Sequence, residues 1–191
     1  MGVYLVSIDR RQWFGEEEGG QAAVAAALDG VLRGRGLPPF EPSASEDPPG
    51  WFEEKMAPPM TGFDALCRAH LTPPEQDALL GWTTLVPLSL DTPVTLPLGS
   101  AYDDETVIAG APQALAAARR LAGAIGLPLD AIPATGGNLG LTLWFLEGDA
   151  RRTAPTRPGP WTDDLDTAFY VAVHLRAAEY SLRHGRPMTY S

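Results

Sequence analysis

The stretch from Trp161 to Pro187 constrains the fold of this chain most strongly, because a helix start, a helical period and a helix stop coincide there. Thr162 is suited to an N-cap, and aspartates fill the first turn, where negative charge stabilises the positive end of the helix dipole. Arginine and histidine fill the last turn, and Gly185 followed by Pro187 ends a helix. The pattern predicts a long helix over residues 163–184.

Two side-chain tracks follow this predicted helix. Apolar residues recur at spacings of three, four and seven, which predicts burial against the main core, at Leu165, Ala168, Phe169, Ala172, Leu175 and Leu182. Polar residues form the second track, at Asp166, Tyr170, His174 and Ser181. An acid, a phenol and an imidazole four residues apart can reach one ligand, although such a track is more often the solvated edge of an amphipathic helix. Both interpretations stay open.

Five further segments combine a helical period with start or stop signals, so the sequence predicts about six helices. The five are residues 21–35, 61–71, 72–80, 112–125 and 141–152. Thr61 with Asp64, and Thr72 with Glu75, have the spacing of a capping box.

Strand patterns occupy the rest of the chain. We expect strands at Val3–Ile8 and Thr106–Ala109, and two alternating runs between Trp82 and Leu98 predict a hairpin that turns at residues 91–93. Prolines in both runs cannot donate ladder hydrogen bonds, so we expect this hairpin at a sheet edge or with bulges. Together the elements predict an α+β fold, with the long C-terminal helix packed against a small, mostly antiparallel sheet.

The length of 191 residues predicts one globular domain over residues 1–191. Residues 38–50 are rich in Pro, Ser, Glu and Asp and have no period. We expect a mobile loop there.

The formal net charge is −10, and the isoelectric point is near 4.6. A protein that reads the nucleic-acid backbone needs a basic face to displace counterions from phosphates, and an anionic membrane surface favours the same charge. We therefore expect neither nucleic acid nor a membrane as a partner. The acidity is compatible with a basic protein partner, a cationic ligand or a divalent metal, although such acidity more often serves solubility.

Cys67 is the only cysteine, which excludes an intramolecular disulfide and fits a reducing compartment. Residues 1–9 lack a basic lead, and their apolar run is too short for a secretory signal, so we expect a cytoplasmic location. Lys55 is the only lysine beside many arginines, a skew that is typical of a GC-rich bacterial genome.

Two acidic clusters, at residues 103–105 and 163–166, contain carboxylates of the kind that Mg²⁺ prefers. The second cluster already has a local explanation in the first turn of a helix. The glycine-rich residues 136–140 are not followed by the Lys and Ser or Thr of a phosphate-binding loop, and common hydrolase motifs are absent from the sequence. We expect no metal and no cofactor.

Tryptophan–phenylalanine pairs adjoin acidic stretches near the N-terminal third of the chain. Aromatic anchors within a carboxylate rim are what a binding surface for a basic protein uses, although such pairs more often pack in a core. The candidate partner-binding residues are Trp13, Phe14, Glu16, Glu17, Glu18, Trp51 and Phe52. The leading hypothesis is an acidic, non-enzymatic protein-binding module, such as an inhibitor or an antitoxin-like neutraliser.

The alternative hypothesis is a small-molecule-binding domain or an enzyme with a pocket on the C-terminal helix. The candidate ligand-binding residues are Tyr102, Asp103, Asp166, Tyr170 and His174. In this interpretation His174 is the acid or base, because its ordinary pKa lies near neutral pH.

Overall fold

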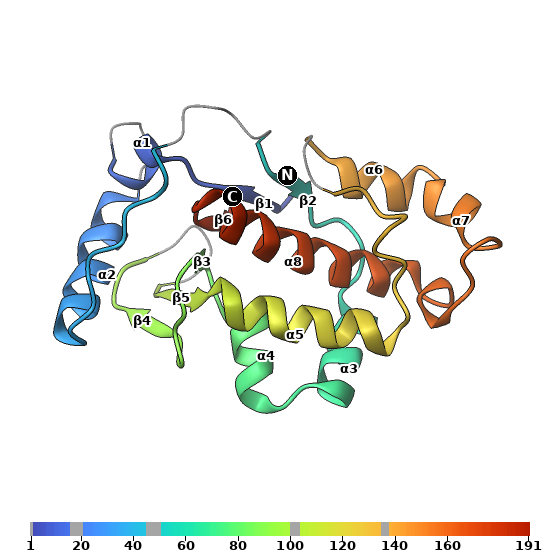
Figure 1. Cartoon of the computed structure of the whole chain (residues 1–191), viewed down its shortest axis with the longest axis horizontal. Helices are drawn as coiled ribbons and strands as arrows, with labels where there is room; N and C mark the ends of the chain where they lie inside the picture. The colour runs from blue at the N-terminus through green and yellow to red at the C-terminus, as the bar shows by residue number, and fades with distance from the viewer. Residues whose placement is uncertain (1, 16–20, 45–50, 100–103, 135–137) are drawn as a thin grey trace.

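The computed structural model describes residues 2–15, 21–44, 51–99, 104–134 and 138–191. In these ranges eight α-helices accompany one six-stranded sheet (Figure 1). The helices are α1 (Arg10–Trp13), α2 (Ala22–Gly34), α3 (Thr61–His70), α4 (Pro73–Leu80), α5 (Ala111–Ala124), α6 (Gly140–Leu146), α7 (Asp149–Thr153) and α8 (Leu165–His184). The strands are β1 (Tyr4–Ser7), β2 (Glu53–Lys55), β3 (Thr84–Val86), β4 (Val94–Leu96), β5 (Thr106–Gly110) and β6 (Met188–Tyr190). The predicted α+β class is confirmed.

The sheet has the order β2-β1-β6-β3-β5-β4. All neighbouring strands are antiparallel except β3 and β5, which run parallel with Val86 opposite Gly110. The expectation of a mostly antiparallel sheet is therefore correct. The strands β2 and β6 were not expected, because each has three residues and lies outside any longer alternating run, unlike β3 and β4.

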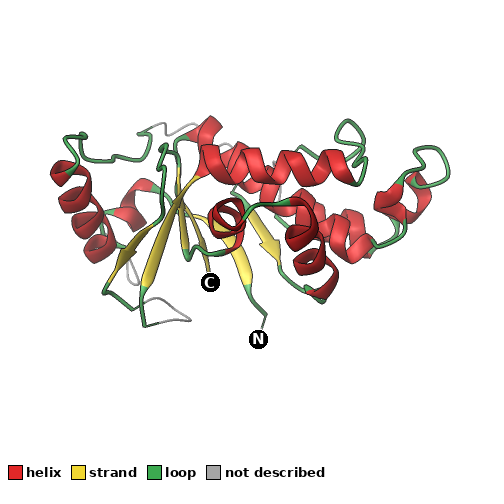
Figure 2. Cartoon of the chain, turned by 90° about the horizontal axis from the view of Figure 1, so that it is seen from below, coloured by secondary structure: helices red, strands yellow, loops and turns green. Residues whose placement is uncertain are grey.

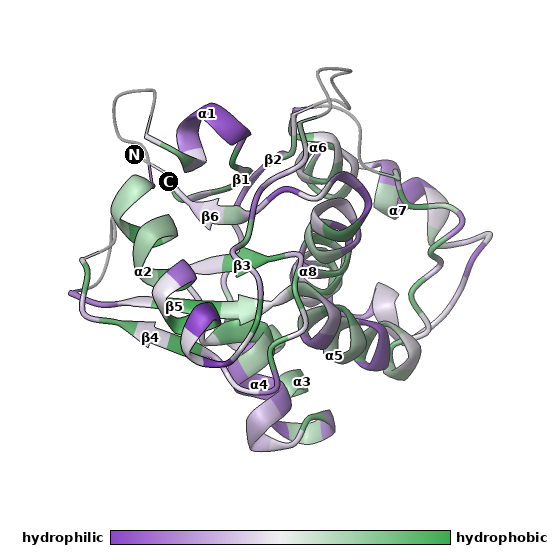
Figure 3. Cartoon of the chain, turned by 60° about the vertical axis from the view of Figure 1, so that its left-hand side comes forward, coloured by the Kyte–Doolittle hydropathy of each residue, from purple (hydrophilic) through white to green (hydrophobic). Residues whose placement is uncertain are grey.

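The two faces of the sheet carry separate hydrophobic cores. Leu85 and Ala109 point to the larger core, which α3, α4, α5, α6 and α8 complete. Val86 and Ile108 point to the smaller core, together with Trp13 of α1 and the apolar side of α2. Figure 2 shows the strands standing between these two helical layers, and Figure 3 shows the apolar colouring of β3 and β5. Successive residues of a strand face opposite sides, so a strand covered on both sides is apolar throughout.

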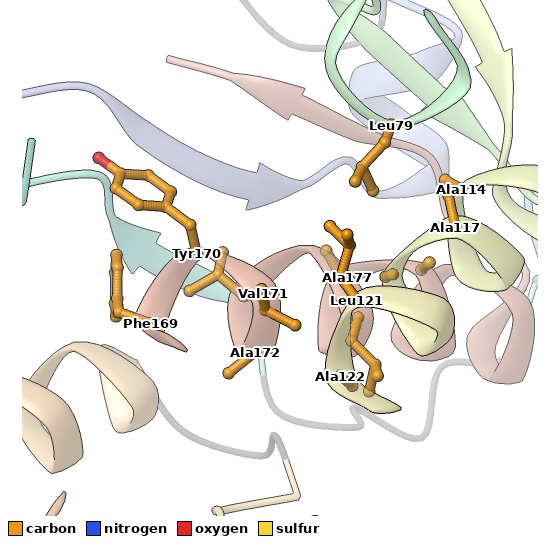
Figure 4. Packing of buried hydrophobic residues seen from close by; sticks show 14 of the residues in the cluster. Leu79, Ala114, Ala117, Leu121, Ala122, Phe169, Tyr170, Val171, Ala172 and Ala177 are labelled. Atoms are coloured by element: carbon orange, nitrogen blue, oxygen red, sulfur yellow. The ribbon is translucent and has the colours of Figure 1, made fainter. Parts of the chain in front are cut away.

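The predicted C-terminal helix is α8, which packs along α5 over the sheet. Figure 4 shows why the two helices approach closely: Ala114, Ala117 and Ala122 of α5 lie in the same cluster as Ala172 and Ala177 of α8. Small side chains at a helix contact allow a short distance between the axes.

Both ends of α8 use specific caps. The carboxylate of Asp164 accepts a hydrogen bond from the Thr167 amide at 3.0 Å, and Gly185 ends the helix at φ +61°. The predicted cap at Thr162 is wrong, because Thr162 belongs to a single 3-10 turn that precedes Asp164.

The hairpin expected between residues 82 and 98 is also wrong. The strands β3 and β4 both form, but β5 lies between them and pairs with each. Residues 87–93, which we call the crossover, therefore pass over the carboxyl end of β5 instead of making a tight turn. Alternation within each run predicts a strand, whereas the choice of partner depends on the later segment 106–110.

Two helix boundaries also differ from expectation. Met60 caps α3, so the Thr61–Asp64 box does not form, while the Thr72–Glu75 box at α4 does. Residues 141–152 are two helices, because Gly148 adopts φ +104° between α6 and α7. A left-handed residue of this kind interrupts the helical hydrogen bonding.

Candidate functional site

A cavity of about 370 Å³ lies at the carboxyl ends of the parallel strands β3 and β5. We call it the crossover cavity, because residues 90–93 of the crossover form one wall. The remaining walls come from the start of α4, the end of β5 and the first turns of α5. Carboxyl ends of parallel strands are a common place for binding sites, since loops and helix starts converge there.

Gly110 makes this arrangement sterically feasible. It ends β5 and caps α5, and the crossover backbone passes directly above it. A Cβ on Gly110 would lie 2.5 Å from the carbonyl oxygen of Leu88 and 2.8 Å from the amide nitrogen of Leu90. Only a residue without a side chain allows that approach.

Gln113 ties the crossover to α5. Its amide oxygen accepts a hydrogen bond from the Leu90 N–H at 3.3 Å, and its amide nitrogen donates to the Ser89 hydroxyl at 2.9 Å. These bonds hold the wall of the crossover cavity in place above the helix start.

The lining of the crossover cavity is mostly apolar, and its rim is acidic. Apolar surface comes from Ala78, Leu90, Pro93, Ala109 and Ala116. The carboxylates are those of Glu75, Asp77 and Asp91. In the described part of the chain, no arginine or lysine forms an ion pair with Asp77 or Asp91.

Glu75 is held in its ionised form. Its carboxylate accepts hydrogen bonds from the Thr72 N–H and hydroxyl, both at 2.8 Å, and from Arg120 at 2.8 Å. The Thr72 amide, the Thr72 hydroxyl and Arg120 together hold the pKa of Glu75 below its ordinary value, because all three bind the charged form. Asp77 and Asp91 are exposed beside it.

The structure separates the candidate ligand residues of α8. Asp166 is exposed near the start of the helix, whereas Tyr170 and His174 are buried in the larger core. Ser181, on the same track, is also buried and donates to the carbonyl oxygen of Arg186. The expectation that this track faces solvent is therefore wrong for Tyr170, His174 and Ser181, which find polar partners inside the protein.

Polar atoms of Tyr170 and His174 have local partners. The Tyr170 hydroxyl donates to the Pro58 carbonyl oxygen at 2.5 Å. The His174 Nδ1 donates to the Tyr170 carbonyl oxygen at 2.9 Å, and its Nε2 lies 3.4 Å from the Tyr190 hydroxyl. The Phe63 ring stacks on both Tyr170 and His174.

Burial changes how these groups titrate. Removal from water lowers the pKa of His174 from 6.5 to about 4, because the charged imidazolium loses its hydration. Burial also raises the pKa of Tyr190. The pKa of Tyr170 is raised by burial and by the nearby negative charges of Asp166 and Asp64. His174 is neutral at pH 7. Neither Tyr170 nor His174 lines the cavities of about 370, 690 and 750 Å³ in the described part of the chain.

The remaining ligand candidates, Tyr102 and Asp103, lie outside the described residues. Asp104 and Glu105, which follow them, line a cavity of about 690 Å³ with Trp82 and Thr83. Trp82, which lines that cavity, contacts His174 edge-on and stacks on Tyr190.

The candidate partner-binding residues divide between core and surface. Trp13 and Phe52 are buried, and Trp13 packs edge-on against Phe40. Phe14 is exposed beneath the Arg10 guanidinium, and Trp51 is half-buried. Glu16, Glu17 and Glu18 lie outside the described residues.

No sequence motif marks the carboxylates of the crossover cavity as a site. Glu75 was expected in a helix cap, which forms, whereas Asp91 was expected in a hairpin turn, which does not. Asp91 shares a cavity with α4 only because the crossover spans β5. The spacing of residues along the sequence does not predict this arrangement.

Comparison with known proteins identifies no relative: no family model, no curated protein and no solved structure matches the chain. No helix in the described residues is long and apolar enough to cross a membrane. The His, Cys, Asp and Glu side chains of the described ranges form no group of three or more that could hold a metal ion.

Proposed function

We propose that this protein is an acidic, non-enzymatic binding module for a basic protein partner, and that the crossover cavity receives an arginine or lysine side chain of that partner. The observation that carries the proposal is an apolar cavity with carboxylates around its rim at the carboxyl ends of β3 and β5. The net charge of −10 favours the encounter with such a partner at long range.

The cavity suits a long cationic side chain better than a large cofactor. Its volume of about 370 Å³ is near the lower end of the range for ligand pockets, roughly 300–1,000 Å³. Lysine and arginine bury an aliphatic stem against apolar surface and keep the charged head in contact with polar groups. The alanines and Leu90 can contact the stem, while Asp77 and Asp91 can contact the head.

The starts of α4 and α5 are the features of this site that favour an anion. A helix N-terminus acts as roughly half a positive charge. Glu75 is already paired with Arg120, but Asp77 and Asp91 each carry a full negative charge at the rim. The sum at the cavity is negative, which favours a cation.

The test is a titration of the protein with the peptide acetyl-Gly-Arg-Gly-amide, followed by amide chemical shifts. We expect the largest shifts at Ala109, Gly110 and Ala116. The double variant Asp77→Asn, Asp91→Asn should bind about tenfold more weakly at low salt, since each exposed pair contributes up to about 1 kcal/mol. Ala116→Trp should block binding, because Ala116 lines the cavity and is exposed.

Matched controls separate this site from general acidity. Glu147→Gln with Asp163→Asn removes two exposed charges elsewhere and should leave binding unchanged. Ala124→Trp places the same ring on the far end of α5. Equal losses in the control and site variants, or shifts spread over all acidic surfaces, would reject the proposal.

A further inference from the structure

A second cavity, of about 750 Å³, lies beside the first half of the crossover. Its walls are the end of α2, residues 37–41, residues 87–89 and the end of α8. Large apolar side chains line it, at Leu32, Leu37, Phe40, Pro87, Leu88 and Leu182. Among the described residues, its one charged lining residue is Glu41, whose carboxylate is paired with Arg10 at 3.1 Å. We call this cavity the arginine groove, for the residues at its edges described below.

Two leucines of the arginine groove are unusually accessible. Leu37 is 43% exposed and Leu182 is 37% exposed. Leu182 belongs to the apolar stripe predicted for the C-terminal helix, yet it lies beyond the part of α8 that α5 and the sheet cover. Adjacent exposed apolar side chains that share a cavity indicate an interaction surface.

Four arginines flank this apolar surface. Arg33 and Arg35 lie within two residues of the lining residues Leu32 and Leu37 at the end of α2. Arg183 and Arg186 directly follow the lining residues Leu182 and Gly185 at the end of α8. In the described ranges, none of the four forms an ion pair with a carboxylate. By contrast, six other arginines each form one, namely Arg10, Arg119, Arg120, Arg152, Arg157 and Arg176.

Helix capping explains only part of this cluster. Arg33 and Arg183 lie in the last turns of α2 and α8, where positive charge stabilises the helix dipole. Arg35 and Arg186 lie beyond those ends. Burial lowers the pKa of His184, and the positive charges of Arg183 and Arg186 lower it further. A positive field therefore exists at this edge of an acidic protein.

We propose that the arginine groove binds an acidic segment of a partner protein, a short peptide in which carboxylates flank large apolar side chains. The apolar side chains would cover Leu37 and Leu182, and the carboxylates would pair with arginines from both helices. The proposal is independent of the function assigned to the crossover cavity, because the two cavities have different linings and, among the described residues, only this one has unpaired arginines within two residues of its lining.

The walls of the groove are suited to such a peptide before it binds. Pro38, Pro39 and Pro87 restrict the backbone on two sides. Phe40 is anchored, since its side chain is buried and its N–H donates to the Asp29 carboxylate at 2.9 Å. A surface that is ordered in advance loses less entropy on binding.

The test selects a random dodecapeptide phage library against the whole protein. We expect the enriched peptides to combine Asp or Glu with Leu, Ile, Phe or Trp. Synthetic fluorescein-labelled copies are then titrated by fluorescence anisotropy at 50 and 300 mM NaCl. Their affinity should fall with salt, because exposed charge pairs are screened.

Variants locate the binding site. Arg35→Glu with Arg183→Glu, and separately Leu182→Ser, should each weaken peptide binding at least about tenfold, or 1.4 kcal/mol. Arg68→Glu with Arg151→Glu makes the same charge change at exposed positions away from the groove and should have little effect. Unchanged thermal unfolding of each variant shows that the fold is retained, since all substituted side chains are exposed.

Three outcomes would overturn the proposal. The first is enrichment of basic or uncharged peptides. The second is equal weakening in the groove and control variants. The third is binding of phosphatidylglycerol vesicles that is lost in the groove variants, which would assign the surface to an anionic membrane.

Discussion

At the scale of single residues, His174 makes stability depend on pH below neutrality. Its pKa is about 4 in the folded protein and near 6.5 in an exposed chain, so the unfolded state binds a proton more readily between these values. The folded state should lose stability as the pH falls from 6.5 to 4. The total is about 3 kcal/mol, at 1.36 kcal/mol for each pKa unit.

The check compares urea unfolding of the wild type and His174→Phe at pH 7, 5.5 and 4.5. Other groups titrate in both proteins: the raised pKa of Glu54 acts in the opposite direction, and the lowered pKa of Asp164 in the same direction. Because these groups are the same in both proteins, their contributions cancel in the difference between the two unfolding free energies. Parallel stability curves for the two proteins would show that His174 does not contribute as described.

Gly110 supports a second prediction at this scale. Gly110→Ala forces the crossover backbone or Gln113 to move, and we expect a loss of about 1–3 kcal/mol, as for other overpacked sites. Gly123→Ala is the matched control, because Gly123 is an exposed residue of α5 with open space around its Cα. The control should gain about 0.5–1 kcal/mol from helix propensity. A Gly110→Ala protein as stable as the wild type would mean that the crossover does not lie close to β5.

At the scale of elements, the cap of α8 joins two helices. The Asp164 carboxylate binds the Thr167 amide and hydroxyl, and these side chains leave no space for a Cβ on Gly62 of α3. Asp164→Ala should therefore cost about 1 kcal/mol of stability, the usual value of an N-cap. Asp163→Ala removes the same charge one residue earlier and should be near neutral, which thermal unfolding of the two variants can establish. Equal losses would indicate a charge effect in place of a cap.

The elements also show what local sequence predicts. The helices at residues 21–35, 72–80 and 112–125 were predicted within a few residues, because their caps, prolines and glycines act locally. The buried positions of Tyr170 and His174 were not predicted. A polar side chain enters a core when a distant group satisfies it, here Pro58 for Tyr170 and Tyr190 for His174.

At the scale of the whole molecule, both proposed sites depend on the order of the strands. The crossover cavity joins residues 74–78 to residues 90–93 and 109–116, and the arginine groove joins the ends of α2 and α8. Sequence patterns predict most of the helices and four of the six described strands, but not that β5 enters between β3 and β4. The acidic composition alone suggested a basic partner. The position of the crossover cavity that would bind this partner depends on the strand order, so it could not be predicted from the sequence.

The two cores also differ in size, and this leads to a prediction about how the molecule opens. The layer of α1 and α2 covers the smaller core, whereas α5 and α8 lie in the larger one. Elements with less buried apolar contact open more readily in native-state hydrogen exchange. We expect amides of α2 to exchange with an opening free energy at least about 2 kcal/mol below that of α8.

Two core variants sharpen this last test. Leu28 and Leu121 are fully buried, one in each core. Leu28→Ala should lower the opening free energy of α2 amides by about 2–5 kcal/mol and affect α8 less. Leu121→Ala should lower the opening free energy in both α2 and α8, since the larger core supports the whole sheet. If Leu28→Ala lowers protection equally in both helices, the sheet couples the two layers into one cooperative unit. In that case a partner bound in the arginine groove would stabilise α8 as much as α2, because the groove contacts both helices.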